Sequence, residues 1–122
     1  MNRPREFLAW AVGMFGPVAL HRDERAARFV EEAVELVHAE GLPAATVLAI
    51  VSRVYERPAG DVEKEIGQAQ ATLECLAENL GISANVMAQR EFGRVQAIPR
   101  EEWDRRHAAK VALGIANLSN AT

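Results

Sequence analysis

The chain has 122 residues, of which 49% are apolar and 25% charged, a composition that excludes a disordered segment and fits one globular domain. With 17 acidic and 14 basic side chains the formal net charge is −3, so the chain has no overall field that would attract nucleic acid. The single cysteine, Cys75, excludes an intramolecular disulfide and is typical of a reducing compartment, so we expect a soluble cytoplasmic protein with no membrane span.

Glycine and proline divide the sequence into helical segments. Gly16-Pro17, Gly41 and Gly81 mark helix ends, whereas Asp61 and Ser83 are suited to cap helix starts. The predicted helices cover residues 6–15, 22–40, 44–56, 62–80, 84–97 and 101–112. We therefore expect an all-α fold, a compact helical bundle of about five to six helices. It should form a single domain over residues 1–122, with its core at about 5–112 and a flexible tail at 113–122.

A few side chains outside the acidic motifs are assigned to the core or the surface from their type and spacing. Trp10 and Phe15 are expected to pack in the core, with stacking on a nucleotide base as the alternative. Cys75 is expected to be a small buried hydrophobe. The three histidines lie far apart in the sequence and lack the spacing of metal ligands. We expect all three on the surface: His21, His38 and His107.

Acidic residues cluster in the second predicted helix. At about 100° per residue, Glu31, Glu32 and Glu35 fall on one arc, opposite an apolar face that includes Val30 and Val34. The i, i+3 spacing lets the carboxylates of Glu32 and Glu35 reach one point. Repulsion between like charges at this spacing destabilises the helix by about 0.3 kcal/mol per pair. A divalent cation would reverse that sign, and carboxylate oxygens are the ligands that Mg²⁺ prefers. The alternative interpretation is a solvated helix face with no ligand.

A second polar stripe lies on the fourth predicted helix. Glu65, Gln68 and Thr72 recur at i, i+3 and i+7, and Asp61 precedes Glu65 by one helical turn. If the two helices packed antiparallel, their acids would form a four-ligand oxygen site. Such a site suits Mg²⁺-assisted phosphoryl chemistry.

The order of these residues resembles a known family. Glu31-Glu32-x-x-Glu35 followed by Glu65-x-x-Gln68 is similar to the acidic motif of the MazG-like all-α nucleotide pyrophosphohydrolases, which is Glu-Glu-x-x-Glu and then Glu-x-x-Asp. The likeness covers roughly residues 7–110 and is closest to a subgroup often found in phage and bacterial genomes. The flanking segments that carry it include Trp10-Ala11, Phe15-Gly16, Arg28-Phe29-Val30, Arg57-Pro58, Glu65-Ile66-Gly67, Leu80-Gly81-Ile82 and Glu91-x-x-Arg94.

The resemblance implies hydrolysis of a nucleoside or deoxynucleoside triphosphate to the monophosphate and pyrophosphate, with Mg²⁺ or alternatively Mn²⁺. It implies a homo-oligomer, a dimer or tetramer. The net charge and the lack of a long apolar run predict no nucleic acid and no membrane as partners. Arg94 and Lys110 would contact the substrate. The implied metal ligands are Glu32, Glu35, Glu65 and Gln68, and Glu31 joins the three glutamates as a catalytic residue, either a supporting acid or a further ligand.

The sequence departs from the family pattern at Gln68, where the motif has aspartate. An amide oxygen binds a cation more weakly than a carboxylate and cannot act as a base. Asp61 could supply the missing charge, although its position favours an N-cap. Two alternatives to an active enzyme therefore stay open. One is a catalytically impaired nucleotide- or metal-binding regulatory module, and the other is a helical interaction protein.

Overall fold

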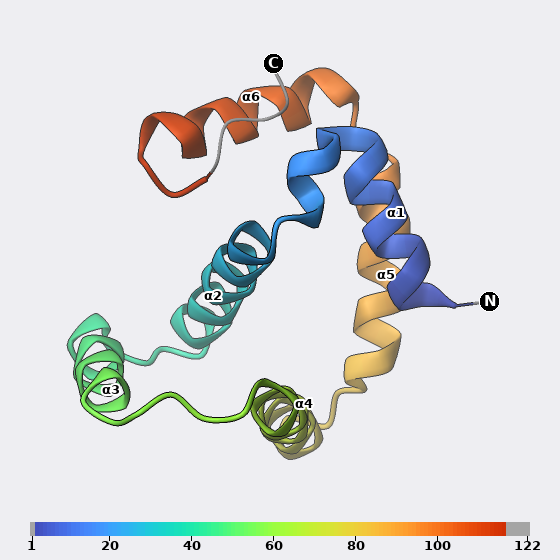
Figure 1. Cartoon of the computed structure of the whole chain (residues 1–122). Helices are drawn as coiled ribbons and strands as arrows, with labels where there is room; N and C mark the ends of the chain where they lie inside the picture. The colour runs from blue at the N-terminus through green and yellow to red at the C-terminus, as the bar shows by residue number, and fades with distance from the viewer. Residues whose placement is uncertain (1, 117–122) are drawn as a thin grey trace. The chain divides into compact units, whose positions relative to one another are not determined.

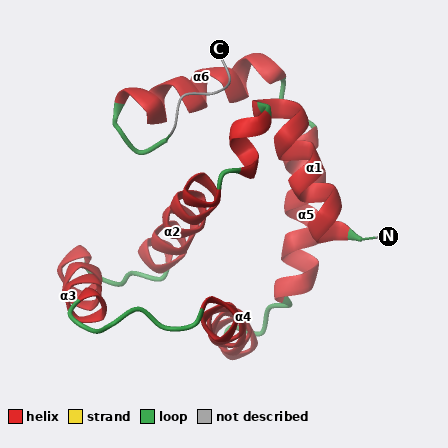
Figure 2. Ribbon diagram, viewed as in Figure 1, coloured by secondary structure: helices red, strands yellow, loops and turns green. Residues whose placement is uncertain are grey.

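The computed structural model describes residues 2–116, whose regular secondary structure is entirely helical, with six α-helices, one 3-10 helix and no strand (Figure 1, Figure 2). The predicted all-α class is therefore confirmed. The elements in chain order are α1 (Arg3–Phe15), η1 (Pro17–Leu20), α2 (Arg22–Ala39), α3 (Ala44–Tyr55), α4 (Val62–Asn79), α5 (Ala84–Gln96) and α6 (Arg100–Ala112). Within residues 2–116, none of the helices has both the length and the apolar character that crossing a membrane requires.

The capping residues define the helix boundaries close to where the sequence predicts them. Asp61 caps α4 by accepting a hydrogen bond from the Lys64 backbone N–H at 3.2 Å, and Ser83 accepts one from the Val86 N–H at 3.2 Å. Gly81 follows α4 with φ +72°, a left-handed conformation that glycine adopts without a Cβ penalty. These caps confirm the predicted helix starts at α4 and α5 and the predicted end of α4.

The N-terminal region differs from the prediction in two respects. Helix α1 begins at Arg3, not at residue 6, because the Asn2 side chain accepts a hydrogen bond from the Arg5 N–H at 3.1 Å and Pro4 is compatible with a first helical turn. The 3-10 helix η1, which the sequence analysis did not predict, buries Val18 and Ala19 beside α1. The second difference adds Val18 and Ala19 to the apolar core near the N-terminus.

The chain divides into two compact units. The first comprises the described residues up to Val37 and those from Phe92 onward, and the second comprises His38–Glu91. The boundaries fall inside α2 and α5, and a single domain over residues 1–122 stays a prediction. The predicted flexible tail at 113–122 lies outside the described residues from 117 onward, whereas residues 113–116 form the capping turn of α6.

An aromatic cluster forms the core of the first unit. The rings of Trp10 and Trp103 lie 5.2 Å apart and meet edge to face, a favourable arrangement for aromatic pairs. The indole N–H of Trp103 donates to the Val95 carbonyl at 3.3 Å, so its polar atom is satisfied. The cluster consists of Phe7, Trp10, Phe15, Phe92, Trp103 and His107. The expected core packing of Trp10 and Phe15 is confirmed.

Two side chains differ in exposure from the prediction. His107 is half-buried and therefore less exposed than expected, because its ring packs on Phe15 at 5.4 Å and its Nε2 atom is buried. Cys75 was expected to be buried but is exposed. The buried positions nearby on α4 are Leu76, which is half-buried, and Ala77, which is buried, so Cys75 lies at the margin of that face.

Candidate metal centre and adjoining ionic network

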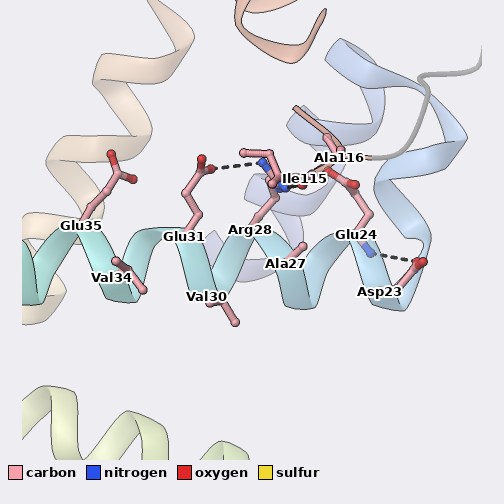
Figure 3. Close-up of a pocket in the computed structure, with 11 residues that line it drawn as sticks. Asp23, Glu24, Ala27, Arg28, Val30, Glu31, Val34, Glu35, Ile115 and Ala116 are labelled. Atoms are coloured by element: carbon pink, nitrogen blue, oxygen red, sulfur yellow. Dashed lines mark hydrogen bonds and ion pairs between the residues drawn. The ribbon is translucent and has the colours of Figure 1, made fainter. Parts of the chain in front are cut away.

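The three acids predicted on one helix are brought together on α2, in the first unit. Each of Glu31, Glu32 and Glu35 offers a carboxylate oxygen within 4.8 Å of the others. Glu31 and Glu35 rise from the same side of the helix, whereas Val30 and Val34 point to the other side (Figure 3). Helical spacing places Glu35 next to both Glu31 and Glu32, because residues three and four apart are neighbours on a helix surface.

The carboxyl group of Glu32 is electrostatically disfavoured as an anion. Burial of the group raises its pKa, and so do the charge of Glu35, a hydrogen bond with Glu35 and the charge of Glu31. Lys110 acts in the opposite direction. The residue as a whole is exposed, but its carboxyl group lies close enough to other groups to lose part of its hydration. The cluster is therefore stabilised by any added positive charge, either a proton or a cation.

Glu31 already has two cationic partners. Its Oε1 atom lies 3.1 Å from Arg28 Nη1 and 2.9 Å from Lys110 Nζ. Lys110 reaches it from α6, so this carboxylate joins two helices of the first unit. Glu31 consequently differs from Glu32 and Glu35, for which the described residues show no ion pair with a basic side chain.

A buried acid that no sequence motif predicted pairs with the Nε atom of Arg28. Glu24 is only 3% exposed, and its carboxylate lies 3.2 Å from Arg28 Nε. A buried carboxylate requires a charged or hydrogen-bonding partner, and Arg28 provides one. The i, i+4 spacing of the two residues was a sequence signal for this pair, but nothing in the sequence pattern marked Glu24 as buried.

The capping turn of α6 completes the surroundings of Arg28. The Gly114 N–H donates to the Val111 carbonyl and the Ile115 N–H donates to the Lys110 carbonyl, both at 3.0 Å, and Gly114 has φ +74°. This pair of bonds is the Schellman arrangement of a helix end. The turn presents the Ile115 carbonyl to Arg28 Nη2, which donates a hydrogen bond to it. Arg28 is thereby held by three groups in a fixed orientation.

An open pocket with a volume of about 750 Å³ lies along α2 and this turn (Figure 3). Its walls combine acidic, basic and apolar side chains, all from the first unit. The lining residues are Asp23, Glu24, Ala27, Arg28, Val30, Glu31, Val34, Glu35, Gly114, Ile115 and Ala116. The pocket is large enough for a small molecule with a charged portion and an apolar portion.

The other predicted site residues belong to α4 and α5. Arg94 is in the last turn of α5, in the first unit, while Glu65 and Gln68 are on α4, in the second unit. The structure therefore assembles the α2 half of the predicted four-ligand site, and the complete site stays a prediction. The carboxylate of Asp61 accepts from the Lys64 N–H, which confirms its assignment as the N-cap of α4.

The donor set on α2 fits a hard divalent cation. Glu32 and Glu35 offer carboxylate oxygens, and burial together with the charge of Glu35 raises the pKa of Glu32, so a cation between the two carboxylates would be stabilised. Glu31 fits less well, because its Oε1 atom is engaged with Arg28 and Lys110. Glu32 and Glu35 are thus the residues of this cluster best suited to hold Mg²⁺.

Comparison with known proteins identifies no relative. No protein-family model matches the chain, no curated protein matches it, and no solved structure matches it. The likeness to MazG-like pyrophosphohydrolases consequently rests on the order of acidic residues along the sequence, and membership of that family is a proposal.

Proposed function

We propose that the protein is a MazG-like, Mg²⁺-dependent nucleotide pyrophosphohydrolase that converts a nucleoside or deoxynucleoside triphosphate to its monophosphate and pyrophosphate. The observation that carries this proposal is the cluster of Glu31, Glu32 and Glu35, whose carboxylate oxygens lie within 4.8 Å of one another beside an open pocket. The pKa of Glu32 supports it as well, because burial and the neighbouring carboxylates of Glu35 and Glu31 raise that pKa, and a bound cation would compensate the negative charge that they disfavour.

In this proposal Glu32 and Glu35 hold the cation from α2, and Glu65 and Gln68 complete its oxygen ligands from α4. A bound Mg²⁺ would neutralise phosphate charge and lower the pKa of a ligated water. Arg94 and Lys110 contact the phosphate groups. The proposal includes a homo-oligomer, in which further copies of the chain cover apolar residues such as Leu48 and Ile66, which their own unit leaves exposed.

The test is an assay of monophosphate and pyrophosphate release from a panel of NTPs and dNTPs, with Mg²⁺ and then Mn²⁺. Glu32→Gln and Glu65→Gln should each reduce release to the background level. Glu40→Gln is the matched control, since it removes the same charge from an exposed residue just beyond the end of α2. Release by Glu32→Gln at the wild-type rate would overturn the assignment of the site.

A second candidate is a nucleotide- or metal-binding module that has lost turnover. The neutral side chain of Gln68 favours it, because the predicted site then has one negative charge fewer than the family motif. This module would bind Mg²⁺ and nucleotide, and both would raise the melting temperature, without releasing pyrophosphate. Gln68→Asp should then create activity, whereas a fully active wild-type protein excludes this candidate.

A further inference from the structure

Two basic side chains converge on a single oxygen atom beside the acidic cluster. Arg28 Nη1 and Lys110 Nζ lie 3.1 Å and 2.9 Å from Glu31 Oε1. Charged donors from arginine and lysine meeting at one anionic oxygen are also the arrangement that binds a phosphate oxygen. The Glu31 carboxylate therefore occupies a position at which an external anion could be held.

This ion-pair group is accessible from the solvent. The side chain of Glu31 is 28% exposed and that of Lys110 is 30% exposed, so Glu31 can swing away without unpacking the core. Both Arg28 and Glu31 line the open pocket of about 750 Å³, and Figure 3 shows Glu31 reaching toward Arg28 along the same side of α2 as Glu35. An anion in the pocket thus has access to the two basic groups.

Arg28 keeps its position when Glu31 leaves. Its Nε atom stays paired with the buried Glu24 at 3.2 Å, and its Nη2 atom stays bonded to the Ile115 carbonyl. The count of formal charges over Glu24, Arg28, Glu31 and Lys110 is zero, so withdrawal of Glu31 leaves one net positive charge. An incoming phosphate group compensates that charge at a cation whose orientation is already fixed.

We propose that Arg28 and Lys110 form a binding site for a phosphate chain, and that Glu31 is a built-in competitor that occupies this site until the phosphate displaces it. The identification of that chain as the triphosphate of a nucleotide rests on the proposed function. Glu31 then acts on substrate affinity through Arg28 and Lys110, and it is not a ligand of the metal.

The test is titration calorimetry with inorganic pyrophosphate in metal-free buffer containing EDTA. Glu31→Gln removes the competitor and should tighten pyrophosphate binding by about three- to tenfold, the free energy of one or two partly exposed ion pairs. Glu35→Gln is the matched control, because it removes the same charge one helical turn away on the same pocket wall. It should tighten binding by less than about twofold through the general field alone. Lys110→Gln should weaken binding.

Tighter binding by Glu31→Gln than by Glu35→Gln supports the proposal. Equal tightening by both variants, or unchanged or weaker binding by Glu31→Gln, overturns it. If Glu31→Gln fails to fold, Lys110→Gln decides, and wild-type affinity for pyrophosphate in that variant overturns the proposal. The readout needs no turnover, so tightening in Glu31→Gln with no nucleotide hydrolysis by the wild type would sustain this site while the proposed function failed.

Discussion

Removal of the buried acid of α2 should destabilise the protein through the charge that it leaves behind. Glu24 is 3% exposed and pairs with Arg28, whose side chain is 17% exposed. In Glu24→Ala the guanidinium of Arg28 loses this partner but keeps Glu31 and the Ile115 carbonyl. The positive charge of Arg28 is therefore less stabilised in this variant, but it is not left without a partner.

The decrease in the free energy of unfolding in Glu24→Ala should lie between two limits. Removal of one member of a fully buried ion pair costs about 3–5 kcal/mol, whereas a solvent-exposed ion pair contributes about 1 kcal/mol or less. Because Arg28 retains two partners, we expect a decrease in the free energy of unfolding of about 2 kcal/mol. At about 4 °C per kcal/mol for a chain of this length, the melting temperature should fall by about 8 °C.

Urea denaturation followed by circular dichroism measures this loss, and a shift in the midpoint with an unchanged slope would assign it to stability. Glu40→Ala is the control, because it removes the same charge from an exposed position beyond the other end of α2 and should change stability by less than about 0.5 kcal/mol. A loss in Glu24→Ala no greater than that of the control would refute the reasoning.

Three further predictions concern Glu32, Trp103 and Cys75. Burial and neighbouring carboxylates raise the pKa of Glu32, so the native state holds this proton to a higher pH than the unfolded chain does, and the free energy of unfolding falls as the pH rises through that window. In EDTA the melting temperature of Glu32→Gln should therefore exceed that of the wild type by a margin that grows from about pH 4 to about pH 7, and a shrinking margin contradicts the assignment. Trp103→Ala removes a ring packed in the aromatic cluster and a satisfied indole N–H, so it should cost about 3 kcal/mol in urea denaturation, with Trp103→Phe costing clearly less; equal losses would argue against ring packing as the cause. Cys75 is exposed and should react with a thiol reagent in the native protein at a rate within about tenfold of the unfolded rate, whereas protection until unfolding would show that it is covered.

The helices could be predicted from the sequence because their ends are determined locally. Asp61 and Ser83 satisfy backbone N–H groups within three residues, and Gly81 adopts a left-handed conformation next to the helix that it ends. The 3-10 helix after Gly16 has a different origin, since it is stabilised by burial of Val18 and Ala19 beside α1. Such tertiary burial leaves no periodic pattern in a segment of four residues.

Some features of the candidate site likewise follow from local helical spacing, whereas others depend on tertiary packing. The grouping of Glu31, Glu32 and Glu35 follows from helical spacing and was predictable, as was the N-cap role of Asp61. Glu31 and Lys110 lie far apart in the sequence, so only the fold, which brings Lys110 within reach of Glu31, reveals their ion pair. The environments of His107 and Glu24 were mispredicted or missed for the same reason, because burial of a polar side chain depends on which distant element covers it.

We assign Glu32 and Glu35 as metal ligands and exclude Glu31 from that role. Titration with Mn²⁺, monitored by the electron paramagnetic resonance signal of the free ion, tests this assignment most directly. The wild-type protein should bind Mn²⁺, and Glu32→Gln and Glu35→Gln should each weaken binding by at least about tenfold, since each removes a carboxylate ligand. Glu31→Gln should stay within about threefold of the wild type, because the Glu31 carboxylate is engaged with Arg28 and Lys110. Absence of Mn²⁺ binding by the wild type, or a loss in Glu31→Gln as large as that in Glu32→Gln, would contradict the account.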